Sequence, residues 1–568
     1  MCGIAGIIGS CPEKSFLLNK MLKAQNHRGP DAMGTWEGEF IALGHNRLSI
    51  IDLSPKANQP MISNCGQVII VMNGEIYNYR ELRLQLNEYK YSTVSDTEVV
   101  IAAYKKWGKD MLQRLNGMFS FVIWDNKRKL LFAARDRFGV KPFYYAISDS
   151  SMYFASEIKT LWAAGIPKEK NLSVWAKYLA HGSYGLPDET FWSGIKQLPA
   201  GHYFEVDMTE SKTIKRIIPL KWYDFASRIK MTQEMELAEL RNQYLDLLKE
   251  SIKLRFRSDV PVGFNISGGL DSSTLLALIN LEYSNNSDIE AFTFYTGHPD
   301  YDELPWVEQL ISLTGNPLNK VLLKSADVPA LVEKISYYQG EPFGGFPTLA
   351  YSLIFQRARE KGVIVLLDGQ GMDEAWAGYD YYHNNSGFKI QGTTTSPVRP
   401  EVLDPDFIQL AQKEVYFEPF EDRLLNLQFR DIFYTKIPRA LRFNDRISMM
   451  YGTELREPFL DFRLVELAFS QPAEIKMKDG LSKWMLRDLV KDMLGDNIAL
   501  APKRPLQTPQ REWLAGELRS YCDEMIKQFC SFEFALSSEV MDIWSRYKAG
   551  ENDNSFYIWQ WINLSQLA

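Results

Sequence analysis

The chain has 568 residues, which is too long for a single hydrophobic core, so at least two domains are expected. Its composition, with 45% hydrophobic and 24% charged residues, is typical of a soluble globular protein, and no apolar run reaches membrane-spanning length. The net charge of −7 excludes a broad basic surface, so small molecules are the expected partners, with no nucleic acid and no membrane.

Residues 1–9 form an apolar run broken by glycines, which predicts a first strand rather than a signal peptide. Cys2 is the first residue with recognisable chemistry. If Met1 is removed, Cys2 carries a thiol and a free α-amine, and an amine with a pKa near ~8 can act as the base for that thiol. The alternative is a cysteine placed there by chance. The other cysteines are scattered without a CxxC pair, which favours free thiols in a reducing cytoplasm. They are Cys11, Cys65, Cys522 and Cys530.

Four segments with distinctive sequences follow in the first hundred residues. They are 27–31 (HRGPD), 44–52 (GHNRLSIID), 68–78 (VIIVMNGEIYN) and 95–98 (SDTE). The segment 44–52 alternates like a half-buried strand, and 68–72 predicts a strand that runs into an Asn-Gly-Glu motif. Together with Cys2, and in this order, these segments resemble the N-terminal-nucleophile glutaminase domain of the asparagine synthetase family.

This resemblance implies a catalytic centre for glutamine hydrolysis. Cys2 would attack the side-chain amide of glutamine. The side chain of Asn73 and the N–H group of Gly74 would hold the oxyanion of the tetrahedral intermediate.

The resemblance also implies how glutamine is bound. Arg47 would pair with its carboxylate in a bidentate fork, and Glu75 and Asp96 would hold its ammonium group. Without the resemblance, Arg47 is an ordinary strand arginine and Asp96 is an ordinary helix N-cap.

The remainder of this region is rich in predicted strands. Segments 119–124 and 130–134 flank a polar turn at 125–127 and predict a hairpin. Arg135 and Glu157 are interpreted as a structural ion pair. A looser, polar segment then predicts the domain division, which gives a glutaminase domain at 1–207, a linker at 208–225 and a second domain at 226–568.

The second domain begins with helical periodicity at 232–255, and strands then alternate with helices. The predicted strands are 260–266, 290–295, 320–323 and 363–367. This alternation predicts a doubly wound parallel sheet, in which ligands bind at the carboxyl ends of the strands. The segments after strands one, two and four, which are 267–273, 300–303 and 368–374, are acidic or glycine-rich and are expected to meet there. The last third is mainly helical and ends in a packed helix at 556–562.

The segment 267–273 reads SGGLDSS between the first strand and a helix. Its glycines let the backbone approach a phosphate, and the first N–H groups of the helix and the serine hydroxyls can bind it. Asp271 would repel a phosphate unless a divalent metal lay between them. The alternative is a turn that caps a core helix.

SGGLDSS resembles the pyrophosphatase loop of ATP-dependent amidotransferases, and no Gly-Lys-Ser/Thr of a Walker loop follows it. With this loop the resemblance covers essentially the whole chain, which is identified as a member of the glutamine-hydrolysing asparagine synthetase family. The implied fold is an αββα sandwich of the N-terminal-nucleophile type, followed by an α/β doubly wound parallel sheet of the ATP-pyrophosphatase type with a helical C-terminal part. The implied reaction releases ammonia from glutamine and transfers it to adenylated aspartate, giving asparagine, AMP and pyrophosphate.

The resemblance also implies the residues that bind ATP and Mg²⁺. Those for ATP are Ile266, Ser267, Gly268, Gly269, Leu270, Asp271, Ser272, Ser273, Thr293, Asp368, Gly369, Lys483 and Lys503. Those for Mg²⁺ are Asp271 and Asp373. Glu341 falls where the family places a glutamate thought to act as a base on ammonia. The alternatives are an exposed loop glutamate at Glu341 and solvated side chains at the two lysines.

Three departures from the family pattern lie near the expected acceptor pocket. Segment 368–374 reads Asp-Gly-Gln-Gly-Met-Asp-Glu where the family has Ser-Gly-Glu-Gly-Ser-Asp-Glu, so Gln370 replaces a glutamate. Segment 505–506 is Pro-Leu instead of Gly-Phe, and Asn265 replaces an aliphatic residue. The alternative acceptor is therefore another carboxylate, such as a uronic acid, which has no ammonium group to bind.

Two other classes of protein are weighed against this reading. A glutaminase coupled to sugar-phosphate amination would share the Cys2 domain, but the segment 267–273 argues against it. A non-catalytic binding module would be expected to lack Cys2, Asp271 or the loop glycines, and all are present. A homodimer is compatible with the sequence.

Overall fold

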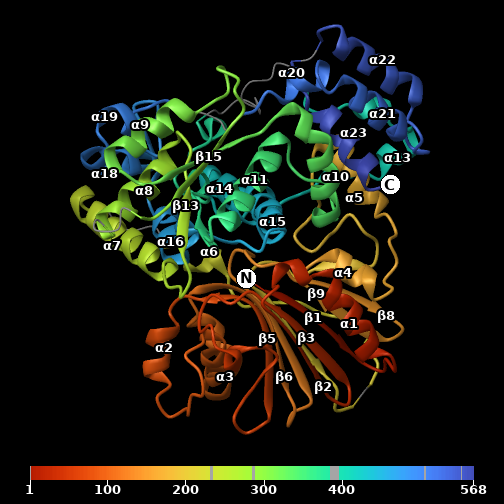
Figure 1. The fold of residues 1–568 in the computed structure, drawn as a ribbon, viewed down its shortest axis with the longest axis vertical. Coiled ribbons are helices and arrows are strands. Elements are labelled where there is room, and N and C mark those ends of the chain that lie inside the picture. The colour runs from red at the N-terminus through yellow and green to blue at the C-terminus, as the bar shows by residue number, and fades with distance from the viewer. Residues whose placement is uncertain are drawn as a thin grey trace.

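The computed structural model describes residues 2–210, 212–230, 235–283, 288–383, 396–503, 507–551 and 553–568. Within these residues the chain forms two antiparallel sheets of six strands, one parallel sheet of five strands and a short two-stranded sheet. Figure 1 shows the antiparallel sheets at the bottom, in red to yellow, and the parallel sheet with its helices above them. Among the described helices, none combines the length and the apolar character needed to cross a membrane.

The two antiparallel sheets pack face to face. In spatial order, one contains β10 (Ile195–Gln197), β8 (Tyr144–Ser148), β9 (Ser151–Ala155), β1 (Gly3–Ile8), β3 (Ile41–Arg47) and β2 (Ala32–Glu37). The other contains β12 (Leu220–Lys221), β11 (His202–Asp207), β7 (Leu130–Arg135), β6 (Gly117–Asp125), β5 (Val68–Ile76) and β4 (Met61–Ile62). Apolar side chains of both sheets, among them Ile4, Val71 and Phe154, form the core between them.

Helices cover both outer faces of this sandwich. Helix α1 (Lys14–Ala24) packs on β1 and β3, with α4 (Ile158–Ala163) beside it. Helix α3 (Asp96–Trp107) packs on β5, with α2 (Tyr79–Gln85) beside it. These four layers agree with the αββα arrangement expected from the sequence. The hairpin predicted around 125–127 is formed by β6 and β7.

Two details of the sequence interpretation are wrong in this region. The strand placed at 44–52 ends at Arg47, and every residue of β3 is buried because the strand lies between α1 and the second sheet. Arg135 and Glu157 do not pair. The guanidinium of Arg135 donates to the carbonyl groups of Lys141 (2.6 Å), Gly139 (2.7 Å) and Leu198 (2.6 Å), and Glu157 binds other cations, described below.

The parallel sheet has the order β15 (Leu318–Leu322), β14 (Ala291–Tyr295), β13 (Val262–Asn265), β16 (Val365–Leu367) and β17 (Glu454–Arg456). After β13 the chain adds β14 and β15 on one side of it, and then returns to add β16 and β17 on the other side. The strand order therefore reverses between β13 and β16, and a ligand crevice is expected at the carboxyl ends of these two strands. The four predicted strands are present with slightly shorter or shifted bounds, and β17 adds a fifth that the sequence did not reveal.

Helices lie on both faces of this sheet. The main ones are α7 (Leu237–Arg255), α8 (Leu270–Glu282), α9 (Leu304–Thr314), α10 (Val328–Gln339), α11 (Phe346–Glu360), α15 (Lys436–Met449), α16 (Phe462–Phe469) and α18 (Trp484–Leu494). The C-terminal part is helical, with α20 (Gln510–Ala515), α21 (Arg519–Phe529), α22 (Ser537–Lys548) and α23 (Phe556–Gln566). Helix α23 packs against α21 and against α5 (Leu172–His181), so the predicted packed final helix is confirmed.

Candidate functional site

A first candidate centre lies at the N-terminal end of β1. Cys2 is buried, and its backbone nitrogen, which becomes the α-amine once Met1 is removed, donates to Oδ1 of Asn73 (3.1 Å). The Sγ atom lies 3.8 Å from the carbonyl oxygen of Leu48, and the carbonyl of Cys2 accepts a hydrogen bond from Nε of Arg28 (3.0 Å). The thiol and the nitrogen that could act as its base are thereby fixed beside a side-chain amide.

Asn73 and Gly74 are neighbours in β5. The Nδ2 atom of Asn73 is buried and has no acceptor within the described parts of the chain, so its hydrogens are available to a ligand. Gly74 has a φ of +149°, and a Cβ there would lie 2.1 Å from the carbonyl oxygen of Met118 in the neighbouring β6, so glycine is required. An unused amide donor beside a nucleophile is what a developing oxyanion needs.

Two buried carboxylates stand near this centre. Burial raises the pKa of Asp96 to about 6, and burial together with the charge of Asp96 raises the pKa of Glu75 well above its usual range. Asp96 is the first residue of α3 and accepts a hydrogen bond from the N–H of Ile76 (2.8 Å), while Ser95 is the N-cap, so the interpretation of Asp96 as the cap is off by one residue. A bound ammonium group would stabilise the charged form of both carboxylates.

Arg47, the last residue of β3, already has several acceptors. Its Nη1 donates to the carbonyl of Ser54 (2.9 Å) and to Oδ1 of Asn58 (2.7 Å), and its Nη2 donates to the carbonyl groups of Ile51 (3.4 Å) and Asp52. The arginine thus fixes the loop that follows its own strand. A carboxylate ligand would have to share or displace these acceptors, so the bidentate fork stays a prediction.

Arg28 connects this centre to the second domain. Its Nη1 and Nη2 bind the carboxylate of Asp445 in α15 (2.9 and 3.1 Å), and its Nη1 also binds Glu157 (2.9 Å). Glu157 in turn binds Lys159 (2.8 Å), and all four side chains are buried. Because Arg28 also contacts the carbonyl of Cys2, helix α15 is linked to the cysteine centre through one side chain.

The second candidate centre is a cavity of about 960 Å³, the central cavity, at the carboxyl ends of β13 and β16. Most of the residues predicted to bind ATP line it. They are Ser267, Gly268, Gly269, Leu270, Asp271, Ser272, Asp368, Gly369, Lys483 and Lys503. Ile266 and Thr293 line a smaller cavity next to it. Ser273 lines neither cavity, because its hydroxyl points back along α8 and donates to the carbonyl of Gly269 (2.8 Å).

The SGGLDSS loop leads directly into α8, whose N-cap is Gly269. The hydroxyl of Ser272 donates to the carbonyl of Ser267 (2.8 Å) and holds the loop closed on itself. Three residues of the acidic segment, which are 301–303, line the smaller cavity together with Ile266 and Ser267, and Oε2 of Glu303 accepts from the N–H of Gly268 (3.2 Å). The expected meeting of this segment with the loop is therefore confirmed for 301–303, whereas Asp300 is exposed and lines neither cavity.

Two carboxylates and two lysines meet in the central cavity. Nζ of Lys483 lies 2.7 Å from Asp271 and 2.7 Å from Asp373, and Nζ of Lys503 lies 2.7 Å from Asp373. Burial alone would raise the pKa of Asp373, but the two lysines hold it at about 2, whereas burial keeps that of Asp271 raised. Lys483 is buried, so its interpretation as a solvated lysine is wrong.

This pair of carboxylates fits a magnesium ion. One ammonium group touches both Asp271 and Asp373, so their oxygens are within reach of a single cation. No group of three or more His, Cys, Asp or Glu side chains suited to a metal occurs in the described residues. Mg²⁺ commonly takes only one or two carboxylates and completes its shell with water and substrate phosphates, so two are enough.

Glu341 lies apart from both centres. It is buried, so the alternative of an exposed loop residue is wrong. Its Oε1 accepts from the N–H of Phe191 in the first domain (3.0 Å), and its Oε2 pairs with Arg442 in the second (3.3 Å). Glu341 does not line the central cavity, and these two partners already use both of its oxygens.

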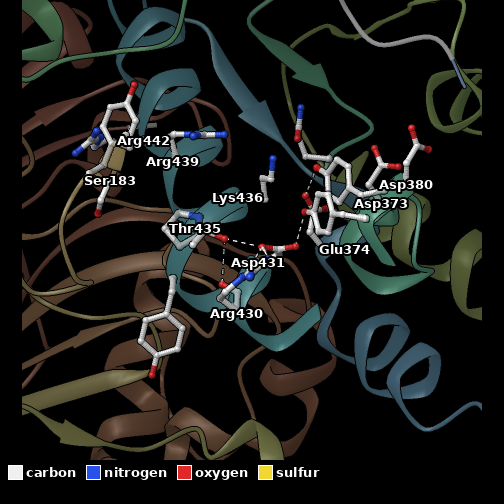
Figure 2. A pocket seen from close by; sticks show the side chains of 18 of the residues that line it. Ser183, Asp373, Glu374, Asp380, Arg430, Asp431, Thr435, Lys436, Arg439 and Arg442 are labelled. Carbon is white, nitrogen blue, oxygen red and sulfur yellow. Dashed lines mark hydrogen bonds and ion pairs between the residues drawn. The ribbon is translucent and has the colours of Figure 1, made fainter. Parts of the chain in front are cut away.

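The central cavity extends well beyond the predicted residues. Figure 2 shows Lys436, Arg439 and Arg442 of α15 along one part of its wall, with Asp373 and Glu374 on another. Tyrosines complete this part of the wall. They are Tyr184, Tyr379, Tyr381, Tyr416 and Tyr434. The only signal in the sequence is the three-residue spacing of the cations between 436 and 442, which a solvated helix face would show equally well.

Asn265, the last residue of β13, has an unusual environment. It is 2% exposed, lines both cavities, and neither its Oδ1 nor its Nδ2 has a partner within the described chain. We therefore expect Asn265→Leu, which keeps the number and branching of the side-chain heavy atoms, to raise KM for ATP about 5- to 15-fold through loss of a hydrogen bond to the ligand. Steady-state kinetics with varied ATP test this, and an unchanged KM in a variant with an unchanged melting temperature contradicts it.

Comparison with known proteins agrees with this two-centre arrangement. A family described as glutamine amidotransferase domain matches residues 1–216, and a family described as asparagine synthase matches residues 243–568. The chain is 30% identical to glutamine-hydrolyzing asparagine synthetase 3 of Bacillus subtilis, over 91% of this chain and 88% of that protein. It is 37% identical to putative glutamine-hydrolyzing asparagine synthetase 2 of Methanocaldococcus jannaschii, over 67% and 76%. It is also 27% identical to amidase chry2 of Gibberella zeae, over 93% and 92%.

Proposed function

Because the chain belongs to the asparagine synthase family, we propose that it couples glutamine hydrolysis in its N-terminal domain to ATP-driven amidation of a carboxylate in its second domain. The observation that carries the proposal is the presence of both centres in one chain. One is a buried Cys2 beside Asn73, and the other is the SGGLDSS loop whose Asp271 shares a lysine with Asp373. The division at 1–207, 208–225 and 226–568 is part of the proposal.

Glutamine hydrolysis would take place at Cys2. With Met1 removed, the α-amine takes the thiol proton and Sγ attacks the side-chain amide carbon of glutamine. The developing oxyanion would accept hydrogen bonds from Nδ2 of Asn73 and the N–H of Gly74. Ammonia leaves as the thioester forms, and water then releases glutamate. Glu75 and Asp96 would hold the substrate ammonium group.

Arg47 would contribute to the same step by binding the carboxylate of glutamine. The ammonia released at Cys2 then has to reach the second domain without protonation, because ammonium has no lone pair with which to attack. Transfer inside the protein satisfies this requirement.

Amidation would take place in the central cavity. The acceptor carboxylate attacks the α-phosphorus of ATP, pyrophosphate leaves, and ammonia then attacks the acyl carbon and displaces AMP. The N–H groups at the start of α8, with Lys483 and Lys503, would bind the phosphates. Asp271 and Asp373 would hold Mg²⁺, which offsets the charge of the pyrophosphate. Glu341, which is held by the N–H of Phe191 and by Arg442, would act as a base on ammonia.

Free aspartate is one candidate acceptor, in keeping with the names of the two asparagine synthetases above. Its ammonium group needs an anionic partner. Asp368 offers one, because its Oδ2 is buried with no partner among the described residues, and an ammonium group there would oppose the effect of burial, which raises the pKa of Asp368 to about 6. Gln370, in place of the family glutamate, offers no charge. The cations of α15 favour a second class of acceptor, which carries more negative charge than aspartate does.

The test follows both the nitrogen and the nucleotide. The full chain is incubated with ATP, Mg²⁺, glutamine labelled with ¹⁵N in its amide, and a panel of carboxylates. We expect ¹⁵N in an amide product, with one AMP formed for each product. Formation of ADP in place of AMP, or a product without ¹⁵N, would contradict the proposed function.

A further inference from the structure

Helix α15 presents three cations to the central cavity. Lys436, Arg439 and Arg442, here called the cationic row, are spaced three residues apart and all line the cavity. Side chains with this spacing lie on one face of a helix, and six residues span about 9 Å along its axis. Figure 2 shows the row with Lys436 at the end nearer to Glu374 and Asp373.

The row carries positive charge that the chain itself does not neutralise. In the described residues, no ion pair joins Lys436 or Arg439 to a carboxylate, and only Arg442 has one, with Glu341 (3.3 Å). Nζ of Lys436 lies 4.9 Å from the ring centre of Tyr379, and the guanidinium of Arg439 lies 5.6 Å from that of Tyr184. Aromatic rings therefore lie against these two cations, and the carboxylates that act on Lys436, which are Asp431 and Glu374, form no ion pair with it in the described residues.

Asp431, which acts on the charge of Lys436 without forming an ion pair with it, already has other partners. Asp431 accepts hydrogen bonds from the hydroxyls of Tyr381, Tyr382 and Thr435 (2.6, 2.7 and 2.6 Å) and pairs with Arg430 (3.1 Å). Because Asp431 already has these four partners, its charge is not available to neutralise the cationic row.

A partly buried charge without a partner costs free energy. Burial and the neighbouring charge of Arg439 lower the pKa of Lys436 to about 8. The lysines at the other end of the cavity, Lys483 and Lys503, lie against carboxylates instead. Lys436 and Arg439 have no such carboxylate in the described residues, so a bound ligand would have to supply the negative charge that pairs with them.

The row begins beside the predicted ATP site and leads away from it. The ring centre of Tyr379 lies 4.1 Å from Nζ of Lys503 and 4.9 Å from Nζ of Lys436, at the first end of the row. At the far end, the guanidinium groups of Arg439 and Arg442 lie 5.6 and 5.1 Å from the ring centre of Tyr184 in the first domain. The acceptor side of the cavity therefore runs from the phosphate loop along α15 to Tyr184.

We propose that the acceptor is a carboxylic acid that also carries a phosphate or diphosphate group, and that the cationic row binds that group. This inference rests on the proposed function and specifies its substrate class. A phosphate ester carries about −1.5 to −2 charges at pH 7, which matches the two unpaired cations, and arginine forks fit phosphate oxygens. Free aspartate fits less well, because one carboxylate reacts and its ammonium group would be repelled by the row.

The test compares acceptors that differ in phosphorylation. The full chain is supplied with ATP, Mg²⁺ and ammonium chloride, and AMP formation is measured with glucuronic acid, glucuronic acid 1-phosphate, UDP-glucuronic acid and aspartate. We expect at least one of the two phosphorylated probes to exceed glucuronic acid at least tenfold in kcat/KM. The monophosphate and the diphosphate probes distinguish the two sources of the charge.

Variants of the cationic row test whether the row causes the preference for phosphorylated acceptors. In Lys436→Met and Arg439→Gln the ratio of kcat/KM for the phosphorylated to the unphosphorylated probe should fall at least tenfold. Both variants remove an unpaired charge, so the fold should persist. Lys361→Met is the matched control, because Lys361 is exposed after α11 and does not line the cavity. Its ratio should match that of the unaltered chain.

Two other outcomes count against the inference and are distinguishable. If aspartate gives a higher kcat/KM than both phosphorylated probes, and Lys436→Met behaves as Lys361→Met, the inference is wrong while the amidotransferase function stands. If no carboxylate yields AMP although glutamine is hydrolysed, the proposed function fails, and the inference fails with it.

Discussion

Replacing Cys2 with alanine is expected to reduce glutamine hydrolysis by about 10³-fold or more, while ammonium chloride still supports AMP formation. In the proposed reaction the thiol is the nucleophile and its own α-amine is the base, so the substitution would remove the bond-forming atom. The second centre is separate from Cys2 and keeps its phosphate loop and its lysines.

The measurement is glutamate release and AMP formation in parallel, with each nitrogen source. Cys65→Ala is the matched control, because Cys65 is an exposed cysteine on the same domain. Intact-mass analysis of the unaltered chain should show that Met1 is absent. Active protein that retains Met1 would contradict the role of the α-amine.

Replacing Asp271 with asparagine is expected to lower AMP formation by about 10³-fold or more with either nitrogen source, while glutamine hydrolysis persists. Asp271 is one of the two carboxylates that would hold Mg²⁺, and it is an ion-pair partner of Lys483. Removing its charge therefore removes a metal ligand and frees a lysine from its partner. Because Lys483 keeps Asp373, the folded cavity should survive.

Asp300→Asn is the control for this second prediction. Asp300 belongs to the segment that follows β14, but it is exposed and lines neither cavity, so its loss should leave AMP formation within about twofold. Equal AMP formation by Asp271→Asn and by the unaltered chain would exclude the metal role of Asp271.

Much of this architecture was predictable because the decisive patterns are local. The hairpin of β6 and β7 follows from two apolar runs around a polar turn, and the loop at 267–273 follows from glycines between a strand and a helix. The short strand β17 was not predictable. Its residues Glu454 and Arg456 are charged, and they are buried at the edge of the sheet because they pair with each other (2.6 Å) and because Arg456 also donates to the carbonyl groups of residues 255 and 257.

The environments of Glu341 and of the cationic row could not be predicted from the sequence, because they depend on contacts between segments that are far apart in the chain. Glu341 reads as a loop glutamate because Phe191 and Arg442, its partners in the fold, lie far away in the chain. From the sequence, the cationic row is indistinguishable from a solvated helix face. Only the fold shows that this face lines the central cavity. The departure at 505–506 lies outside the described residues, and its role stays a prediction.

The central claim is that the acceptor carboxylate is activated as an adenylate in the central cavity. Its most direct test uses aspartate and glucuronic acid 1-phosphate, each labelled with ¹⁸O in the carboxylate, with ATP, Mg²⁺ and glutamine. For whichever compound is converted, we expect one ¹⁸O atom in the phosphate of AMP, because displacement by ammonia leaves the bridging oxygen on the nucleotide. AMP free of ¹⁸O, or ¹⁸O found in inorganic phosphate together with ADP, would contradict the account.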